Sequence, residues 1–402
     1  MTTVQDLIFL TQRIPFPPDK GDKIRSYHVL RHLAERHRIH LGCFIDDPHD
    51  ERHVPRLREL CTSMLCLPIR RPFALARGAA HLARGHSLSE GYFADARMAR
   101  WVRSTVADVV PENIFVFCSS MAPYALAVRD RCRVVMDMVD VDSEKWRAYA
   151  EAAAWPLNAL YAREASAVLA LERRAALAFD RSFFSSPHET ELFLRRAPDC
   201  AGKVGSFLNG VDFDYFDPQR AYDNPYPDGI EAVAFTGAMD YEPNVRAVIW
   251  YARNVFAEIR RTRPRSEFWI VGANPSPAVA ALADSGGIRV TGRVPDMRPY
   301  LRYAGCVVAP LQIARGLQNK VLEAMAMDRT VVATPPAWEG LTAVPGKELF
   351  LAETAAEFAA TVLDVLAGRR IAQGARARIV CDHQWSKNLD VLLQQFETRM
   401  AS

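Results

Sequence analysis

A glycine, a lysine and a glutamate recur at helical spacing in the last third of the chain. Gly316, Lys320 and Glu323 are four and then three residues apart, so they would share one stripe of a helix over 317–327. Free N–H groups and the positive dipole end at the start of that helix would favour an anion, and Lys320 adds a charge. The carboxylate of Glu323 could accept two hydrogen bonds from a vicinal diol. At 1.5 Å per residue the stripe spans about 10 Å, which suits a nucleoside diphosphate.

In this interpretation the phosphates lie near Gly316 and Lys320, and the ribose lies at Glu323. Spacing alone leaves open a second interpretation, in which the helix is an ordinary surface helix with a Lys–Glu pair.

The elements around this helix predict a βαβ unit with buried parallel strands at 305–310 and 329–334. The same alternation of short apolar strands and helices runs through the whole chain. A stretch rich in Pro, Gly, Asn and Asp over 209–229 interrupts it and marks a boundary. We therefore expect an α/β protein with two Rossmann-like, doubly wound parallel-sheet domains that face each other across a cleft.

Composition narrows the class of protein. A chain of 402 residues with 50% hydrophobic and 24% charged residues suits two soluble domains, and a net charge of +3 argues against a nucleic-acid binder. The 8 cysteines form no Cys-x-x-Cys pair, which is typical of a reduced, cytoplasmic protein without a zinc site. The start of the chain does not resemble a signal peptide, and no apolar run is long enough to span a membrane.

Arginines are concentrated between Arg56 and Arg103. This segment has nine of them against three acids, with Phe73, Tyr92, Phe93 and Trp101 interleaved. Such a surface could meet anionic lipid. Two ordinary helices with solvated arginines explain the pattern equally well.

Polar residues also follow two strands expected in the first half. A loop after strand 6–10 carries Lys20, Gly21, Lys23 and Arg25, where α/β sheets bind ligands. Three acids lie at or just after the end of strand 134–138, namely Asp137, Asp140 and Asp142, and they could orient a sugar or acceptor hydroxyl. The alternatives are a turn with solvated charges for the first group and a helix cap at Asp142 or Ser143 for the second. We further expect Ser119 and Ser120 to cap the helix after strand 114–118.

Several motifs resemble one family. Phe207-Leu-Asn-Gly-Val-Asp212, Phe235-Thr-Gly-Ala-Met-Asp-Tyr-Glu-Pro-Asn244 and Lys320-Val-Leu-Glu-Ala-Met-Ala326 resemble the linker, the opening of the second domain and the donor helix of retaining glycosyltransferases of family four, which have the GT-B fold. Trp385-Ser386 resembles the motif before their last helix. The segments 13–26 and 140–146 are similar to the sugar transferases associated with PEP-CTERM/exosortase exopolysaccharide systems.

The resemblance implies a division of labour between the domains. Residues 1–208, with helix 384–402 packing back on them, would bind the acceptor, and residues 209–383 would bind the nucleotide sugar. Glu323 would hold the donor ribose, and Lys320 with the amides near Gly316 would hold the diphosphate. The expected catalytic residues are Asp140, Asp142 and Lys320. The expected donor-binding residues are Gly21, Gly237, Asn244, Arg315, Gly316, Leu317, Lys320 and Glu323.

Three departures from the family pattern change its charges. Arg315 replaces the first acid of the Glu-x7-Glu motif, and a guanidinium there would favour phosphate over a sugar hydroxyl. The stretch 238–242 lacks the usual Arg and Lys, whose charge Arg315 and Lys320 would then supply. Val139 stands where many relatives have His. We expect no metal and no cofactor beyond the nucleotide-diphosphate sugar that serves as donor.

The expected function is transfer of a sugar from a nucleotide sugar to a glycan or polyprenyl-linked acceptor, in the cytoplasm or on the inner membrane face. Two alternatives remain open. One is a non-hydrolysing nucleotide-sugar epimerase, and the other is a non-catalytic nucleotide-sugar-binding subunit of a polysaccharide assembly. A nicotinamide oxidoreductase is disfavoured because the chain lacks a Gly-x-Gly-x-x-Gly motif.

Overall fold

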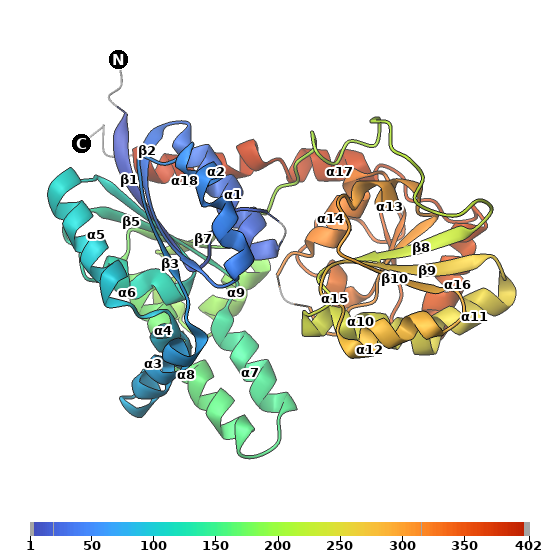
Figure 1. Cartoon of the computed structure of the whole chain (residues 1–402), viewed down its shortest axis with the longest axis horizontal. Coiled ribbons are helices and arrows are strands. Elements are labelled where there is room, and N and C mark those ends of the chain that lie inside the picture. The colour runs from blue at the N-terminus through green and yellow to red at the C-terminus, as the bar shows by residue number, and fades with distance from the viewer. Residues whose placement is uncertain (1–3, 19, 315, 398–402) are drawn as a thin grey trace. The chain divides into compact units, whose positions relative to one another are not determined.

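The computed structural model describes residues 4–18, 20–314 and 316–397 and divides the chain into two compact units (Figure 1). The first unit contains the residues up to Leu208 and those from Ser386 onward, and the second contains Asn209–Trp385. Each unit is built on one sheet in which every pair of neighbouring strands is parallel. The expected α/β class with two parallel-sheet domains is confirmed.

The first sheet has seven strands in the order β3-β2-β1-β4-β5-β6-β7. The order reverses between β1 and β4, so the carboxyl ends of these two strands border the crevice where such sheets bind ligands. The strands are β1 (Gln5–Thr11), β2 (His37–Ile45), β3 (Ser63–Pro68), β4 (Asn113–Phe117), β5 (Arg133–Val139), β6 (Arg181–Phe184) and β7 (Val204–Ser206).

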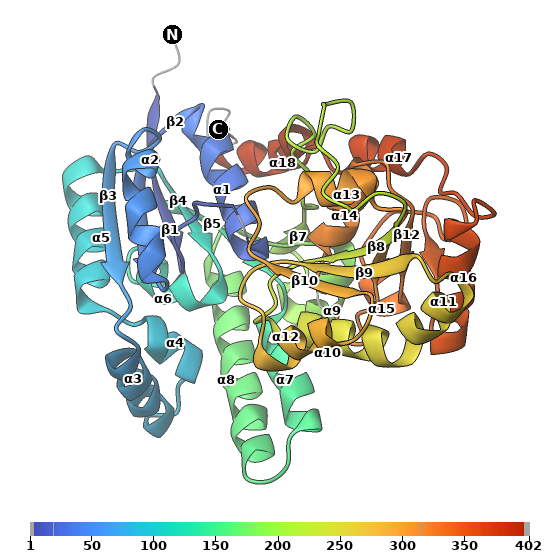
Figure 2. The same cartoon turned by 45° about the vertical axis from the view of Figure 1, so that its right-hand side comes forward.

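Helices connect these strands and form the core with them. Met98 and Val102 of α5 and Leu171 and Ala175 of α8 belong to one buried cluster with the strand residues. The helices α7 and α8 extend well beyond the sheet, and α3 and α4 lie at the same end of the unit (Figure 2). The helices are α1 (Gly21–Ala34), α2 (Val54–Arg58), α3 (Arg71–Ala83), α4 (Leu88–Phe93), α5 (Ala96–Val109), α6 (Ala122–Leu126), α7 (Asp142–Ala152), α8 (Leu157–Ala178) and α9 (Pro187–Leu194), with 3₁₀ turns at Pro48–His53, Ser119–Met121 and Pro198–Cys200.

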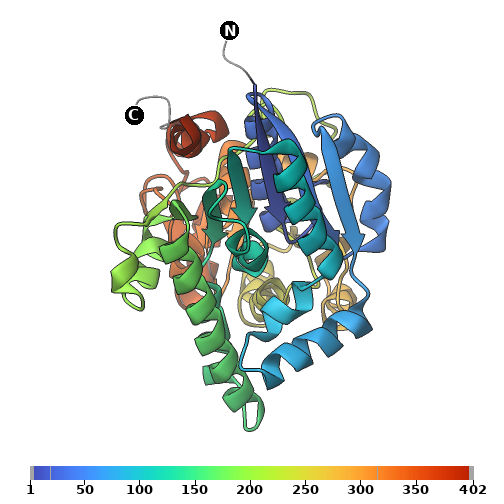
Figure 3. The same ribbon diagram turned by 90° about the vertical axis from the view of Figure 1, so that its left-hand side faces the viewer.

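The last helix, α18 (Trp385–Glu397), begins at the end of the second unit and continues in the first. Figure 3 shows it in dark red beside the first sheet. The ring of Phe396 lies 5.9 Å from that of His37, and Nδ2 of Asn388 donates to the carbonyl of Leu208. The helix therefore packs on the first unit, and its start follows the expected domain boundary at 384 by one residue.

The second sheet repeats the topology of the first with six strands, in the order β10-β9-β8-β11-β12-β13 (Figure 2). Its order reverses between β8 and β11. The strands are β8 (Glu231–Thr236), β9 (Ser266–Val271), β10 (Ile288–Gly292), β11 (Cys306–Ala309), β12 (Val331–Ala333) and β13 (Phe350–Leu351). The helices are α10 (Glu242–Tyr251), α11 (Ala257–Thr262), α12 (Pro277–Ala280), α13 (Arg298–Tyr303), α14 (Asn319–Ala326), α15 (Pro335–Trp338), α16 (Ala355–Leu366) and α17 (Ala375–Asp382), with a π turn at Ala252–Phe256 and a 3₁₀ turn at Ala281–Asp284.

A fully buried ion pair ties α1 to the first sheet. Nε of Arg25 donates to Oδ2 of Asp137 at 2.6 Å, and neither side chain is exposed. Nη1 of Arg25 also donates to the carbonyl of Phe207 at 3.1 Å, and the guanidinium lies 3.8 Å from that residue's ring centroid. Arg25 thus joins α1, β5 and the last residues before the second unit.

Removing either partner of this pair is predicted to destabilise the first unit, because the remaining charge would be buried without its counter-ion. We expect Arg25→Ala and Asp137→Ala each to lower the free energy of unfolding by about 3–5 kcal/mol, measured by urea denaturation. The control is Arg173→Ala, which breaks the exposed pair with Asp199 and should change little. Equal stability of the Arg25 and Arg173 variants would contradict the structural role given to the buried pair.

Candidate functional site

The switch point of the second sheet brings together two segments that are far apart in sequence. The loop after β8 leads from Gly237 into α10, and the loop after β11 leads into α14. Because β8 and β11 are neighbours, both loops border one crevice at the carboxyl end of the sheet. Three of the predicted donor-binding residues, Gly237, Asn244 and Lys320, lie on these two segments.

These three residues are in direct contact. Nζ of Lys320 donates to Oδ1 of Asn244 at 2.7 Å, and Nδ2 of Asn244 donates to the carbonyl of Ala238 at 2.9 Å. Gly237 has a φ of 152°, and a Cβ there would lie 2.7 Å from Nδ2 of Asn244. A side chain at position 237 would therefore displace the amide that positions Lys320. Asn244 and Lys320 each lie in the first turn of their helix, so two positive dipole ends converge with the ammonium.

Burial shifts the pKa values of both charged residues on α14. It lowers the pKa of Lys320 to about 8, while the nearby carboxylate of Glu323 acts in the opposite direction. It raises the pKa of Glu323 to about 7, while Lys320 opposes the shift. Desolvated groups with pKa values near neutrality are typical of sites that exchange charge with a ligand.

Glu323 differs from the buried glutamates elsewhere in the chain. No hydrogen bond to its carboxylate is made by any residue of 4–18, 20–314 or 316–397, and its side chain is half-buried. By contrast, the buried carboxylates of Glu164 and Glu172 each accept several hydrogen bonds. Glu323 therefore keeps its acceptor capacity for a ligand.

The prediction that Gly316 opens the helix of Lys320 and Glu323, which is α14, is wrong. Gly316 does not open it, because α14 begins at Asn319 and Gly316 has a φ of 64°, a left-handed conformation that no α-helix contains. Gly316 therefore does not share a helical stripe with Lys320 and Glu323. The side chain of Leu317 is buried, so only its backbone could face a ligand. Arg315 lies outside the described residues.

The first unit has a polar cluster at its own switch point. Ser120 Oγ donates to Oε1 of Gln12 across the ends of β4 and β1. Ser119 Oγ lies 3.4 Å from Oδ2 of Asp142. Because both hydroxyls have these other partners, neither serine caps α6 as the sequence predicted. Asp142 is the first residue of α7, and its side chain does not serve as a cap.

Burial raises the pKa of Asp140 and of Asp142, the latter to about 6. Ser185 Oγ donates to Oδ1 of Asp140 at 3.0 Å, and this bond partly offsets the rise. Both side chains are half-buried and so remain accessible to a ligand.

Backbone strain coincides with this cluster. Val139 and Cys118, at the ends of neighbouring strands, have φ values of 69° and 71°. The pairing of β5 with β6 shifts register between Asp137 and Val139. Positive φ at a non-glycine residue costs of order 1–3 kcal/mol and is concentrated at functional sites.

Sequence reasoning missed the two glutamates that hold this strained turn. The N–H of Val141 donates to Oε2 of Glu189 at 2.7 Å. The N–H of Ser143 donates to Oε1 of Glu172, and its Oγ lies 2.6 Å from Oε2. Burial raises the pKa of Glu172 to about 8. The available signal was an acid within the Ala-rich helix α8, which also carries Glu164 and three arginines.

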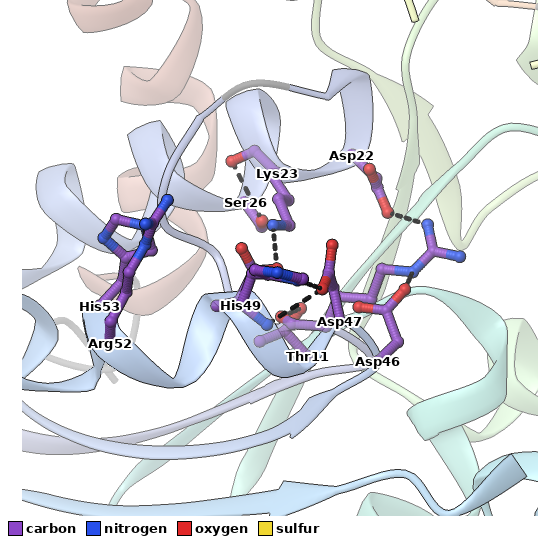
Figure 4. A network of polar contacts seen from close by, with 11 residues as sticks. Thr11, Asp22, Lys23, Ser26, Asp46, Asp47, His49, Arg52 and His53 are labelled. Carbon is purple, nitrogen blue, oxygen red and sulfur yellow. Dashed lines mark hydrogen bonds and ion pairs between the residues drawn. The ribbon is translucent and has the colours of Figure 1, made fainter. Parts of the chain in front are cut away.

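The loop predicted to carry free cations after β1 instead contains ion pairs (Figure 4). Nζ of Lys23 lies 2.5 Å from Oδ2 of Asp50, and both side chains are buried. Asp22 and Asp46 both pair with Arg13, and Arg25 pairs with Asp137. Gly21 is the exposed first residue of α1 and belongs to the first unit, whereas the other expected donor-binding residues belong to the second.

Two kinds of feature are absent from the described part of the chain. Among its residues, no group of three or more His, Cys, Asp or Glu is placed to hold a metal ion. No described helix combines the length and apolarity that crossing a bilayer requires.

Residues 231–368 match the model of the family glycosyl transferases group 1, so this part of the second unit is similar to that family. Among curated proteins, no sequence matches the chain. The whole chain resembles several solved structures, which at these identities shows a shared fold.

Three solved structures illustrate that fold. Sucrose-phosphate synthase from Thermosynechococcus elongatus has 16% identity and a TM-score of 0.72 over 99% of each chain. HepE from Anabaena, solved with UDP and glucose, has 12% identity and a TM-score of 0.69, covering 98% of this chain and 100% of that one. A UDP-N-acetylglucosamine 2-epimerase from Listeria monocytogenes, itself described as putative, has 14% identity and a TM-score of 0.59, covering 98% and 96%. The expected GT-B fold is confirmed.

Binding of a nucleotide sugar at Lys320 and Glu323 is predicted to depend on pH. As pH falls through about 7, Glu323 is protonated and loses a diol acceptor, and as pH rises through about 8, Lys320 loses its charge. Affinity should therefore be highest between these two values, measured by calorimetric titration.

A nucleotide sugar is the suitable probe because it lacks the terminal phosphate of a free nucleoside diphosphate, which titrates near pH ~6. Glu323→Gln should abolish the loss on the acid side and keep the loss on the alkaline side. An affinity that does not change across both pKa values would contradict the assignment.

Proposed function

We propose that this chain transfers a sugar, with retention of configuration, from a nucleoside-diphosphate sugar to a glycan or polyprenyl-linked acceptor in exopolysaccharide biosynthesis. The observation that supports the donor chemistry is the contact of Lys320 with Asn244 at the switch point, within the segment that matches the group 1 glycosyltransferases. A polyprenyl-linked acceptor would require the enzyme to work at the inner membrane face.

The donor diphosphate would lie against the ammonium of Lys320 and the first turns of α10 and α14. As the sugar leaves, negative charge develops on the diphosphate, and fixed cationic and N–H donors stabilise it without reorganisation. Glu323 would accept hydrogen bonds from the two ribose hydroxyls. The proposed sugar transfer would need no metal ion if the charges of Lys320 and Arg315 neutralise the phosphates of the donor.

The acceptor would lie against the first unit, with Asp140 and Asp142 orienting its hydroxyl. Both carboxylates sit on a turn that Glu172 and Glu189 hold, so their positions are defined before any ligand binds. With retention, a phosphate oxygen of the donor could take the acceptor proton, and no protein base would then be required.

A nucleotide-sugar epimerase remains the second candidate, because one structure with this fold is described as such an enzyme. Formation of an isomerised nucleotide sugar without acceptor would favour it. The departures at Arg315 and Val139 keep a non-catalytic binding subunit as a third candidate, which would bind the donor but neither transfer nor hydrolyse it.

A thermal-shift screen with UDP-, GDP- and ADP-sugars tests donor binding and names the base, since a ligand that binds the folded state raises its melting temperature.

Lys320 and Glu323 are predicted to contribute differently to the reaction. Lys320→Ala should lower kcat as well as donor affinity, because its attraction to the diphosphate strengthens in the transition state. Glu323→Gln should mainly raise the donor KM, because the ribose does not change during transfer. The loss of donor binding free energy should be roughly 1.5–3 kcal/mol. Steady-state kinetics on cooperatively melting variants measures both effects.

The exposed Lys347 supplies the matched control, and Lys347→Ala should behave like the unmodified chain. Donor affinity that is unchanged in both the Lys320 and the Glu323 variant would remove α14 from the site.

Asp140 and Asp142 are predicted to act on the acceptor and not on the donor. Asp140→Ala and Asp142→Ala should therefore lower transfer more than donor binding, as turnover and calorimetry together would show. Asp130→Ala, at a side chain that is 90% exposed, is the control for loss of an acid from this unit. Full turnover in both variants would mean that these acids only support the turn.

A further inference from the structure

The outward face of α3 is apolar and uncovered. Phe73 and Leu75 are 63% and 57% exposed, and four alanines continue the face along the helix. Those alanines are Ala76, Ala79, Ala80 and Ala83. The two residues of α3 that are fully buried are small, Ala74 and Gly78. Two of the three large apolar side chains of α3 thus lie in solvent and the third, Leu82, is half-buried, which is the reverse of a core helix.

The rest of the unit holds α3 in this orientation. A Cβ at Gly78 would lie 2.7 Å from Cδ2 of Leu88, so α4 packs closely against the inner side of α3. The buried carboxylate of Glu164 on α8 accepts hydrogen bonds from the N–H groups of Leu88 and Ser89 at the start of α4. The exposed face is therefore not the result of a loosely attached helix.

A second apolar feature lies at the same end of the unit. The turn between α7 and α8 carries Trp155 and Leu157, which are 81% and 50% exposed. Figures 1 and 3 both show this turn, in green, and α3, in blue, at the end of the first unit to which α7 and α8 extend. Nη2 of Arg163 on α8 donates to the carbonyl of Leu82 and so links the two features.

The charge at the two ends of α3 is positive. No acid occurs between Glu59 and Glu90, and Arg70, Arg71 and Arg84 are exposed at the two ends of α3. Near the α7–α8 turn, Glu151 is an exposed acid. An apolar helix face with arginines at its ends is complementary to a bilayer with anionic headgroups, and tryptophan is favoured at the boundary between acyl chains and headgroups.

The sequence suggested a lipid-binding surface over the whole segment from Arg56 to Arg103, and the structure reduces it to a smaller set of residues. Phe93 and Trp101 pack against the buried core, and the exposed Arg56 and Arg97 are paired with Glu59 and Asp95. Tyr92 is half-buried, which leaves Phe73 as the exposed aromatic residue of the original set.

We propose that α3 and the α7–α8 turn together dock the first unit on the surface of a bilayer that contains anionic lipid. Phe73, Leu75, Trp155 and Leu157 enter the interfacial layer, and Arg70, Arg71 and Arg84 lie among the headgroups. The inference rests on these exposed residues alone and needs no nucleotide. Its failure would therefore leave the donor site at Lys320 untouched, and failure of the donor site would leave this surface untouched.

The test is sedimentation of the full chain with phosphatidylcholine vesicles, with and without phosphatidylglycerol. We expect binding to the anionic vesicles that weakens with added salt, and little binding to the neutral ones. Phe73→Ser/Leu75→Ser and Trp155→Ser/Leu157→Ser should each weaken it at least tenfold, since each removes two large apolar side chains from the interface. Arg71→Glu/Arg84→Glu should weaken it at least fivefold.

Matched controls use residues of the same type elsewhere in the first unit. Val110→Ser removes an apolar side chain that is 74% exposed after α5, and Arg131→Glu reverses an exposed arginine, and neither should change binding. All variants alter exposed side chains, so their melting temperatures should match the unmodified chain. Sedimentation that is absent, equal on neutral vesicles, or unchanged in the serine variants would overturn the proposal. So would light scattering that shows a dimer lost on Phe73→Ser/Leu75→Ser, because the face would then bind a second copy.

Discussion

The donor site that we propose depends on keeping the half-buried Lys320 charged. Burial lowers the pKa of Lys320 to about 8, and the hydrogen bond from its Nζ to Oδ1 of Asn244 holds the ammonium where two helices begin. The bond is possible because β8 and β11 are neighbours in the sheet and because Gly237 leaves room for the amide of Asn244. Fixed N–H groups and one desolvated cation then face the same crevice, which is the arrangement that stabilises a leaving diphosphate.

The first unit positions its polar groups by a different device on the same topology. The turn that follows its strained Val139 is held by Glu172 and Glu189, two buried acids from different helices. Both units thus place polar groups at the carboxyl end of a parallel sheet, the second unit a cation and the first unit carboxylates. This division of charge is what donor and acceptor chemistry would each require, because phosphate needs cations and a hydroxyl needs hydrogen-bond acceptors.

Much of this arrangement could be predicted from the sequence, because apolar periodicity is local. The periodicity located the strands and the boundary near Asn209. The motifs singled out Gly237, Asn244 and Lys320, which the fold brings together, and their role in donor binding stays a prediction. Prediction from the sequence failed where long-range pairing decides the outcome. Lys23 and Arg25 look like free cations until Asp50 and Asp137, which lie 27 and 112 residues away, are placed beside them. The prediction also failed at Gly316, which has helical spacing to Lys320 in the sequence but a left-handed backbone that an α-helix cannot contain. The exposed face of α3 could not be told from a core face, since both are apolar.

A crystal structure of the chain with the nucleoside diphosphate that stabilises it most would test the central claim most directly. The account predicts a phosphate oxygen within hydrogen-bonding distance of Nζ of Lys320 and the ribose hydroxyls on the carboxylate of Glu323. A nucleotide bound elsewhere, or bound here with its phosphates away from Lys320, would contradict it.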